Sequence, residues 1–185
     1  MTSEPGQTPA AALYLQDVSI RLRTLKDLAD RALAQVSDED LRVALDPESN
    51  SLAALLLHLG GSLRSRWTDF LATDGEKDDR DRDSEFEPAA DATREQLLAR
   101  WEDGWSRFFA TLAGLTVDDL TRTVTIRAEP HTVVQAIDRS LTHAAYHVGQ
   151  IVFLAKHLSG DAWRTLSVPR GGTRAFNAEM FGKAR

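Results

Sequence analysis

Apolar residues recur every three or four positions along four long stretches of the chain, with charged residues between them. This period is typical of α-helices that turn one face toward a core. The predicted helices run from Ala10 to Gln35, from Asn50 or Ser51 to about Gly75, from about Thr93 to Leu112, and from just after Thr132 to about Leu158. This pattern predicts an all-α fold, a four-helix bundle, with residues 1–185 forming a single domain.

Two segments interrupt the helical pattern. Thr121–Ile126 alternates β-branched residues and, with Glu129-Pro130, predicts a short β-hairpin before the last long helix. Lys77–Glu87 (KDDRDRDSEFE) is highly charged, and its alternating aspartates resemble the opening of a calcium loop. Ser84 and Ala90 stand where such a loop needs glycine and a bidentate glutamate, so an EF-hand is excluded. We interpret the segment as a solvated connection between the second and third helices.

Two adjacent glycines, Gly60 and Gly61, lie inside the second predicted helix. Each lowers helix propensity by about 1 kcal/mol relative to alanine. The pair therefore indicates either a close contact with another helix or a position where the cost is simply tolerated.

Composition narrows the class of protein. Of the 185 residues, 42% are hydrophobic and 27% charged, as expected for a soluble globular protein. The net charge of −6 provides no basic surface for nucleic acid, and no apolar stretch is long enough to span a bilayer. Met1–Pro9 lacks the features of a signal peptide, so we expect a cytoplasmic protein. Because there is no cysteine, disulfides, thiolate ligands and a cysteine nucleophile are excluded.

Three histidines are the strongest candidates for chemistry. His143 and His147 are spaced i, i+4 in the last long helix, which puts both imidazoles on one face. His58 lies among leucines in the second helix, where an unpaired imidazole is costly. Two ligands from one helix and one from another predict a three-histidine site for a divalent metal ion. A site of this kind leaves coordination positions open for water or substrate, as catalytic sites do.

Neighbouring motifs limit what this site is. Ala144 follows His143, so the His-Glu-x-x-His motif of zinc proteases is absent, and so is the Glu-x-x-His motif of di-iron bundles. His157 lies ten residues after His147, about 15 Å along a helix, too far to share the ion. Three imidazoles suit zinc, nickel, iron or copper, and sequence alone does not select among them.

Other polar residues lie about one turn from the histidines: Ser62 in the second helix, and Arg139 and Gln150 in the last. They are candidates to orient the ligands, and Arg139 could meet an anionic substrate. The alternative for all three is surface or structural hydrogen bonding.

The chain resembles the DinB/YfiT-like superfamily of metal-dependent proteins over nearly its whole length, and is most similar to a branch without assigned function. The resemblance rests on Ser49–Leu52, His58–Gly61, Ser65–Phe70, Asp74–Lys77, Asp79–Phe86, His143–Ile151 and Pro169–Gly172. It implies a four-helix bundle with a long crossover connection, often a homodimer, with a divalent ion on the histidines that match His58, His143 and His147. Characterised enzymes of the superfamily include transferases and isomerases that use bacillithiol, mycothiol or glutathione.

Three functions are compatible with these observations, and fold analogy alone does not choose among them. The first is a thiol-dependent transferase acting on a small molecule, with a low-molecular-weight thiol as cosubstrate because the chain has no cysteine. The second is a metal-dependent hydrolase in which the open position holds hydroxide; the lack of an obvious glutamate base beside the site weakens it. The third is a non-enzymatic, metal-stabilised stress or dimerisation module, which would have a shallow or blocked cleft.

Overall fold

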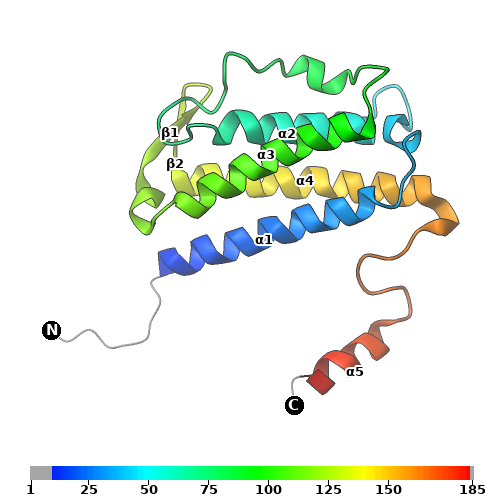
Figure 1. The fold of residues 1–185 in the computed structure, drawn as a ribbon. Helices are drawn as coiled ribbons and strands as arrows, with labels where there is room; N and C mark the ends of the chain where they lie inside the picture. Colours follow the sequence, from blue (N-terminus) through cyan, green and yellow to red (C-terminus); the bar gives the residue numbers. More distant parts are fainter. Residues whose placement is uncertain (1–9, 184–185) are drawn as a thin grey trace.

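The computed structural model describes residues 10–183, so the expectation drawn from Met1–Pro9 lies outside the described residues. Within this range, long helices pack side by side as a bundle (Figure 1). They are α1 (Ala10–Leu33), α2 (Leu52–Trp67), α3 (Arg94–Gly114) and α4 (Val133–Ser159). The prediction of an all-α four-helix bundle is confirmed.

Side-chain caps determine where three of these helices begin. Ser51 accepts a hydrogen bond from the backbone of Ala54 at the start of α2. Thr93 and Thr132 each form a capping box with the glutamine three residues later, at the starts of α3 and α4. These caps satisfy backbone N–H groups that have no partner within the helix.

Helices α2 and α3 run parallel and touch closely. Thr111 donates a hydrogen bond to the backbone oxygen of Trp67, and a Cβ added to Gly104 would lie 2.3 Å from the backbone oxygen of Gly60. Of the two alternatives for the glycine pair, close helix contact is the correct one at Gly60. Because the two helices are parallel, the chain between them must return along the bundle. It does so along the outside of α2, as the long crossover that connects residues 68 to 93 (Figure 1).

The predicted hairpin is present before α4, with β1 (Thr123–Ile126) antiparallel to β2 (Glu129–Thr132). Arg127 and Ala128 form its turn, and both have positive φ, 56° and 62°. Asp74, from the crossover, accepts hydrogen bonds from both of their backbone nitrogens at 2.8 Å. This contact holds a turn that residues other than glycine adopt reluctantly, and it fixes the hairpin to the crossover.

The core is built around large side chains from α2 and α3. Trp67, Trp101, Trp105 and Phe108 are all fully buried, together with leucines from α1 and α2. The Trp67 indole donates a hydrogen bond to Ser140 on α4 at 3.2 Å, so a tryptophan in the core also has its polar atom satisfied.

The end of α2 was wrongly predicted. The apolar pattern continues from Trp67 to Phe70, but the helix ends at Trp67 rather than near Gly75. Asp69 turns the chain with a φ of 48°, and Phe70 folds back to stack on Trp67 with ring centroids 4.2 Å apart. The apolar residue therefore reaches the core from a turn instead of from a further helical turn.

The remaining elements are short or lie outside the bundle. Helix α5 (Thr173–Lys183) has no buried residue and lies apart from the other helices (Figure 1). None of the helices in residues 10–183 combines the length and hydropathy that a bilayer crossing requires. The 3₁₀ turns are η1 (Asp40–Arg42), η2 (Asp83–Phe86), η3 (Val117–Thr121) and η4 (Gly160–Ala162).

Candidate metal centre

The three histidines predicted as metal ligands converge between α2 and α4. One ligand atom from each lies within 4.8 Å of the other two. The Nε2 atom of His143 lies 3.3 Å from Nε2 of His58 and 3.1 Å from Nε2 of His147. His58 and His147 are buried, and His143 is half-buried. Residues 85 positions apart in the chain thus form one compact group.

The spacing of these nitrogens fits a single ion. Zinc–nitrogen bonds of about 2.0–2.1 Å in a tetrahedral arrangement place ligand atoms about 3.4 Å apart. The hydrogen-bond pattern points the same way, because His58 and His147 use Nδ1–H groups to donate elsewhere and so present lone pairs at Nε2. One neutral His143 can donate to only one of these two lone pairs, whereas a shared cation accepts all three.

Glu85 positions His58. Its carboxylate accepts a hydrogen bond from His58 Nδ1 at 3.0 Å, and Arg80 donates to both of its oxygens at 2.8 and 2.9 Å. The side chains of Arg80 and Glu85 are only 3% and 5% exposed. Burial opposes ionisation of Glu85, but the hydrogen bonds from His58 and Arg80 are enough to lower its pKa below the ordinary value. A carboxylate behind a ligating histidine fixes its tautomer and orientation.

The interpretation of Lys77–Glu87 as a solvated connection is therefore wrong for Arg80 and Glu85. These two residues were missed because alternating charges usually indicate a solvated segment. Two sequence signals could have found them: Phe86, an apolar residue within the charged run, and Gly61, a residue without a side chain one turn after His58. In the structure Phe86 packs against His58, with ring centroids 4.6 Å apart.

The three predicted neighbours of the site occupy different environments. Gln150 lies next to the metal centre and accepts a hydrogen bond from His147 Nδ1 at 2.8 Å. Arg139 lines the cavity beside the histidines. Ser62 is fully buried, and its hydroxyl forms no hydrogen bond within residues 10–183. Gln150 is therefore the one of the three that contacts a candidate ligand through a hydrogen bond.

The electrostatic environment favours neutral imidazoles, the form that binds metal. Burial, together with the nearby His147 and the positive charge of Arg66, lowers the pKa of His143 to about 3. Burial also lowers the pKa of His147 from its ordinary value, although the hydrogen bond with Gln150 opposes the shift. Both side chains are accordingly deprotonated at neutral pH and available as ligands.

The candidate metal centre opens into a cavity of about 410 Å³. His58 and His143 form part of its wall, with Thr142, Tyr146 and several arginines. A ligand in this cavity would reach the exposed side of the histidine group. Among the described residues, the cleft beside the histidines is therefore not blocked.

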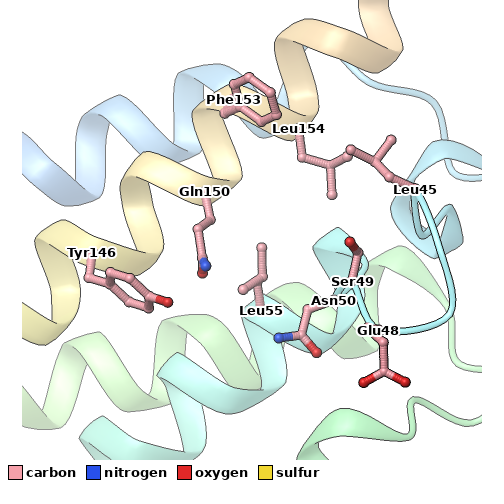
Figure 2. A pocket seen from close by; sticks show the side chains of 9 residues that line it. All are labelled: Leu45, Glu48, Ser49, Asn50, Leu55, Tyr146, Gln150, Phe153 and Leu154. Carbon is pink, nitrogen blue, oxygen red and sulfur yellow. The ribbon is translucent and has the colours of Figure 1, made fainter.

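A second cavity, of about 380 Å³, lies farther along α4 (Figure 2). Tyr146 borders both cavities, and Gln150 projects from α4 into the second one. Leu55 on α2 and Leu45 in the preceding loop supply apolar surface on the opposite side. Phe153 and Leu154, on α4 itself, add further apolar surface. The second cavity is thus connected to the histidine group through Tyr146, which it shares with the first cavity, and through Gln150, which accepts a hydrogen bond from His147.

Comparison with known proteins yields a family without a known role. No curated protein matches the chain. A family model matches residues 9–172, which include α1 to α4, the crossover and all three histidines. The chain belongs to this family, which is described as "Protein of unknown function (DUF1572)".

Proposed function

We propose that this protein is a metal-dependent enzyme in which His58, His143 and His147 hold a divalent ion, and that it is a thiol-dependent transferase. The observation that carries the proposal is a group of three imidazoles, spaced for one ion, at the wall of an open cavity. A divalent ion held there lowers the pKa of a thiol or water that binds it.

The residues of the chain prepare this site for an external nucleophile. Glu85 and Arg80 hold His58 in place, and Gln150 does the same for His147. Ligands fixed in this way would leave a bound ion accessible from the cavity. Since the chain has no cysteine, a reacting thiolate has to come from a cosubstrate. The resemblance to the DinB/YfiT-like superfamily favours a low-molecular-weight thiol in this role.

A hydrolase that activates water is the second candidate, and the cavity makes it less favourable. A carboxylate base would be expected beside the attacking water. No aspartate or glutamate lines the cavity among the described residues. Glu85 is near the site, but His58 and Arg80 occupy both of its oxygens, so it supports a ligand instead of acting as a base.

Elemental analysis of the purified, untagged protein tests the metal centre. We expect about one zinc, nickel or iron per chain in the wild type, and loss of stoichiometric metal in His58→Ala and His143→Ala. His157→Ala is the matched control, because this histidine is exposed on the same helix as His143. Absence of metal from the wild type, even after reconstitution with zinc or nickel, would make the triad a group of core residues and favour an interaction module.

Thiol consumption tests the reaction class. The metal-loaded wild type is incubated with an electrophile and with glutathione, bacillithiol or mycothiol, and free thiol is followed with time. A transferase consumes thiol in the wild type and His157→Ala but not in His143→Ala. Thiol-independent cleavage of an ester or phosphoester that depends on His143 would instead establish the hydrolase. The superfamily resemblance also implies a homodimer, which sedimentation of the full chain tests.

A further inference from the structure

Five arginines line the cavity beside the metal centre. They come from four parts of the chain: Arg66 from α2, Arg80 and Arg82 from the crossover, Arg127 from the hairpin turn, and Arg139 from α4. The chain as a whole carries a net charge of −6, so this concentration of positive charge runs against its overall composition. A concave wall of one sign raises the local concentration of ligands of the opposite sign.

Three of these arginines have carboxylate partners. Arg80 pairs with Glu76 and Glu85, and Arg127 also reaches Glu76, at 3.3 Å. Arg82 lies 3.9 Å from Asp83, an exposed residue, so its charge is only weakly offset. The remaining two differ: neither Arg66 nor Arg139 forms an ion pair within the part of the chain that the structure describes.

Arg66 is the more unusual of the two because it is buried. It is 9% exposed, and its Nε atom is buried without a hydrogen-bond partner. Burial lowers the pKa of Arg66 to about 10, and the positive charges of Arg139 and Arg80 contribute to the shift. Buried charges are normally paired, because desolvation without compensation is costly. An anion in the cavity would supply the missing compensation for Arg66 and would also meet Arg139, an exposed arginine in the same cavity wall.

We propose that this cavity binds an anionic group with two negative charges, either a phosphate or a pair of carboxylates, through Arg66 and Arg139. Arginine suits such groups because its planar fork of donors can bind two oxygens at once. The inference rests on the proposed function in one respect: the opposite end of the anionic ligand would bind the metal ion held by the histidines.

The helix positions separate the two arginines from the histidines. Arg139 precedes His143 by four residues, about 6 Å along α4. Arg66 follows His58 by eight residues, about 12 Å along α2. The backbones of the two arginines are therefore offset from those of the histidines by about 6 and 12 Å along their helices. A ligand that contacts both the histidines and the arginines is expected to be larger than free phosphate, which serves here as a probe of the arginines.

Isothermal titration calorimetry of the full chain, as purified and in low-salt buffer, tests the anion site. The probes are inorganic phosphate and glutarate, with the neutral glutaramide as the control ligand. The variants are Arg66→Met and Arg139→Met, which keep most of the side-chain volume, and Arg174→Met, an exposed arginine on α5, is the matched control. Binding of phosphate identifies a phosphate site and binding of glutarate a carboxylate site, and either result supports the proposal.

We expect each cavity variant to weaken binding of the anion at least about tenfold, the usual effect of losing a charge-assisted hydrogen bond. Arg174→Met and the wild type should bind equally, and added salt should weaken both. The proposal is overturned if the wild type binds neither anion at about 10 mM. It is also overturned if glutaramide binds as well as glutarate, or if both cavity variants retain wild-type affinity.

Elemental analysis of the same samples separates this inference from the proposed function. Arg66→Met and Arg139→Met should keep their metal while losing the anion. His143→Ala should lose its metal and still bind the anion, since both arginines remain. A wild type that binds the anion but carries no metal contradicts the proposed function alone, and a wild type that carries metal but binds no anion contradicts this inference alone.

Discussion

A methyl group added at Gly61 should disturb the metal centre without touching a ligand. Gly61 lies on α2 one turn after His58, on the side that the crossover covers. A Cβ at this position would lie 2.2 Å from Oε1 of Glu85 and 2.8 Å from its Cδ. Ordinary contact between such atoms begins at about 3.4 Å, so the carboxylate has to retreat by about 1 Å. The Glu85 side chain can move, but it cannot keep its hydrogen bonds to His58 and Arg80 after that movement.

The expected size of the effect follows from what Glu85 does. Loss of a hydrogen-bonded partner behind a ligating histidine lowers metal affinity about 10- to 100-fold, which corresponds to about 1.4–2.7 kcal/mol. The fold itself should suffer less. Alanine in a helix is favoured over glycine by about 1 kcal/mol, and this gain opposes the loss of the buried hydrogen bonds of Glu85.

Competition with a chromophoric chelator measures the metal affinity of Gly61→Ala. The matched control is Gly149→Ala, the same substitution two residues after His147, where an added Cβ meets nothing within 4 Å. We expect the control to keep wild-type affinity and to raise the free energy of unfolding by up to about 1 kcal/mol.

A double-mutant cycle with Glu85→Ala makes the test specific. If the methyl group acts through Glu85, Gly61→Ala should have no further effect on affinity once Glu85 has been removed. Two independent losses that simply add would refute this route of action. Wild-type affinity in both single variants would show that Glu85 does not support His58 as a ligand.

Two further predictions concern the structure around the site. Gly104→Ala places a Cβ 2.3 Å from the backbone oxygen of Gly60, which cannot rotate away; α2 and α3 must separate, and urea unfolding should show a loss of about 1–3 kcal/mol, whereas a gain would contradict the close contact. Asp74 is partly desolvated, which raises its pKa, but backbone hydrogen bonds from Glu76, Ala128 and Arg127 outweigh this and lower the pKa to about 2. Its folded pKa is thus below its unfolded value, so its stabilisation is complete above about pH 4 and is lost as the pH falls toward about 2. Relative to Asp74→Asn, the wild type should lose its extra stability over this range in urea unfolding, and a pH-independent difference would contradict the assignment.

Much of the bundle and the ligand set could be predicted because the signals are local. Helical periodicity and N-terminal caps depend on residues within one or two turns, and the i, i+4 spacing of His143 and His147 puts both on one face whatever the rest of the chain does. Adding His58 required only the expectation that an imidazole among leucines has a partner. These parts of the interpretation needed no knowledge of which helices are neighbours.

The support of His58 could not be predicted in the same way. Glu85 and Arg80 bury each other, and charged residues in a run such as KDDRDRDSEFE carry no local mark that distinguishes a buried pair from solvated neighbours. The same limit applies to the end of α2, where Phe70 fits the helical period but reaches Trp67 from a turn. In both places, contacts between segments that are distant in the chain or not helical decide which side chains are buried and where the helix ends.

The topology explains why the crossover supplies so much of the site. Because α2 and α3 are parallel, the chain has to return along α2 (Figure 1). On this path Glu85 comes within hydrogen-bond distance of His58. That path brings Glu85 to the ligand and Arg80 to the cavity wall. Gly61 leaves the space in which Glu85 lies, which ties a residue inside α2 to the path of the crossover. The two helices α2 and α4 therefore position the candidate ligands, while the connection imposed by the parallel helices orients one of them and contributes charge to the cavity.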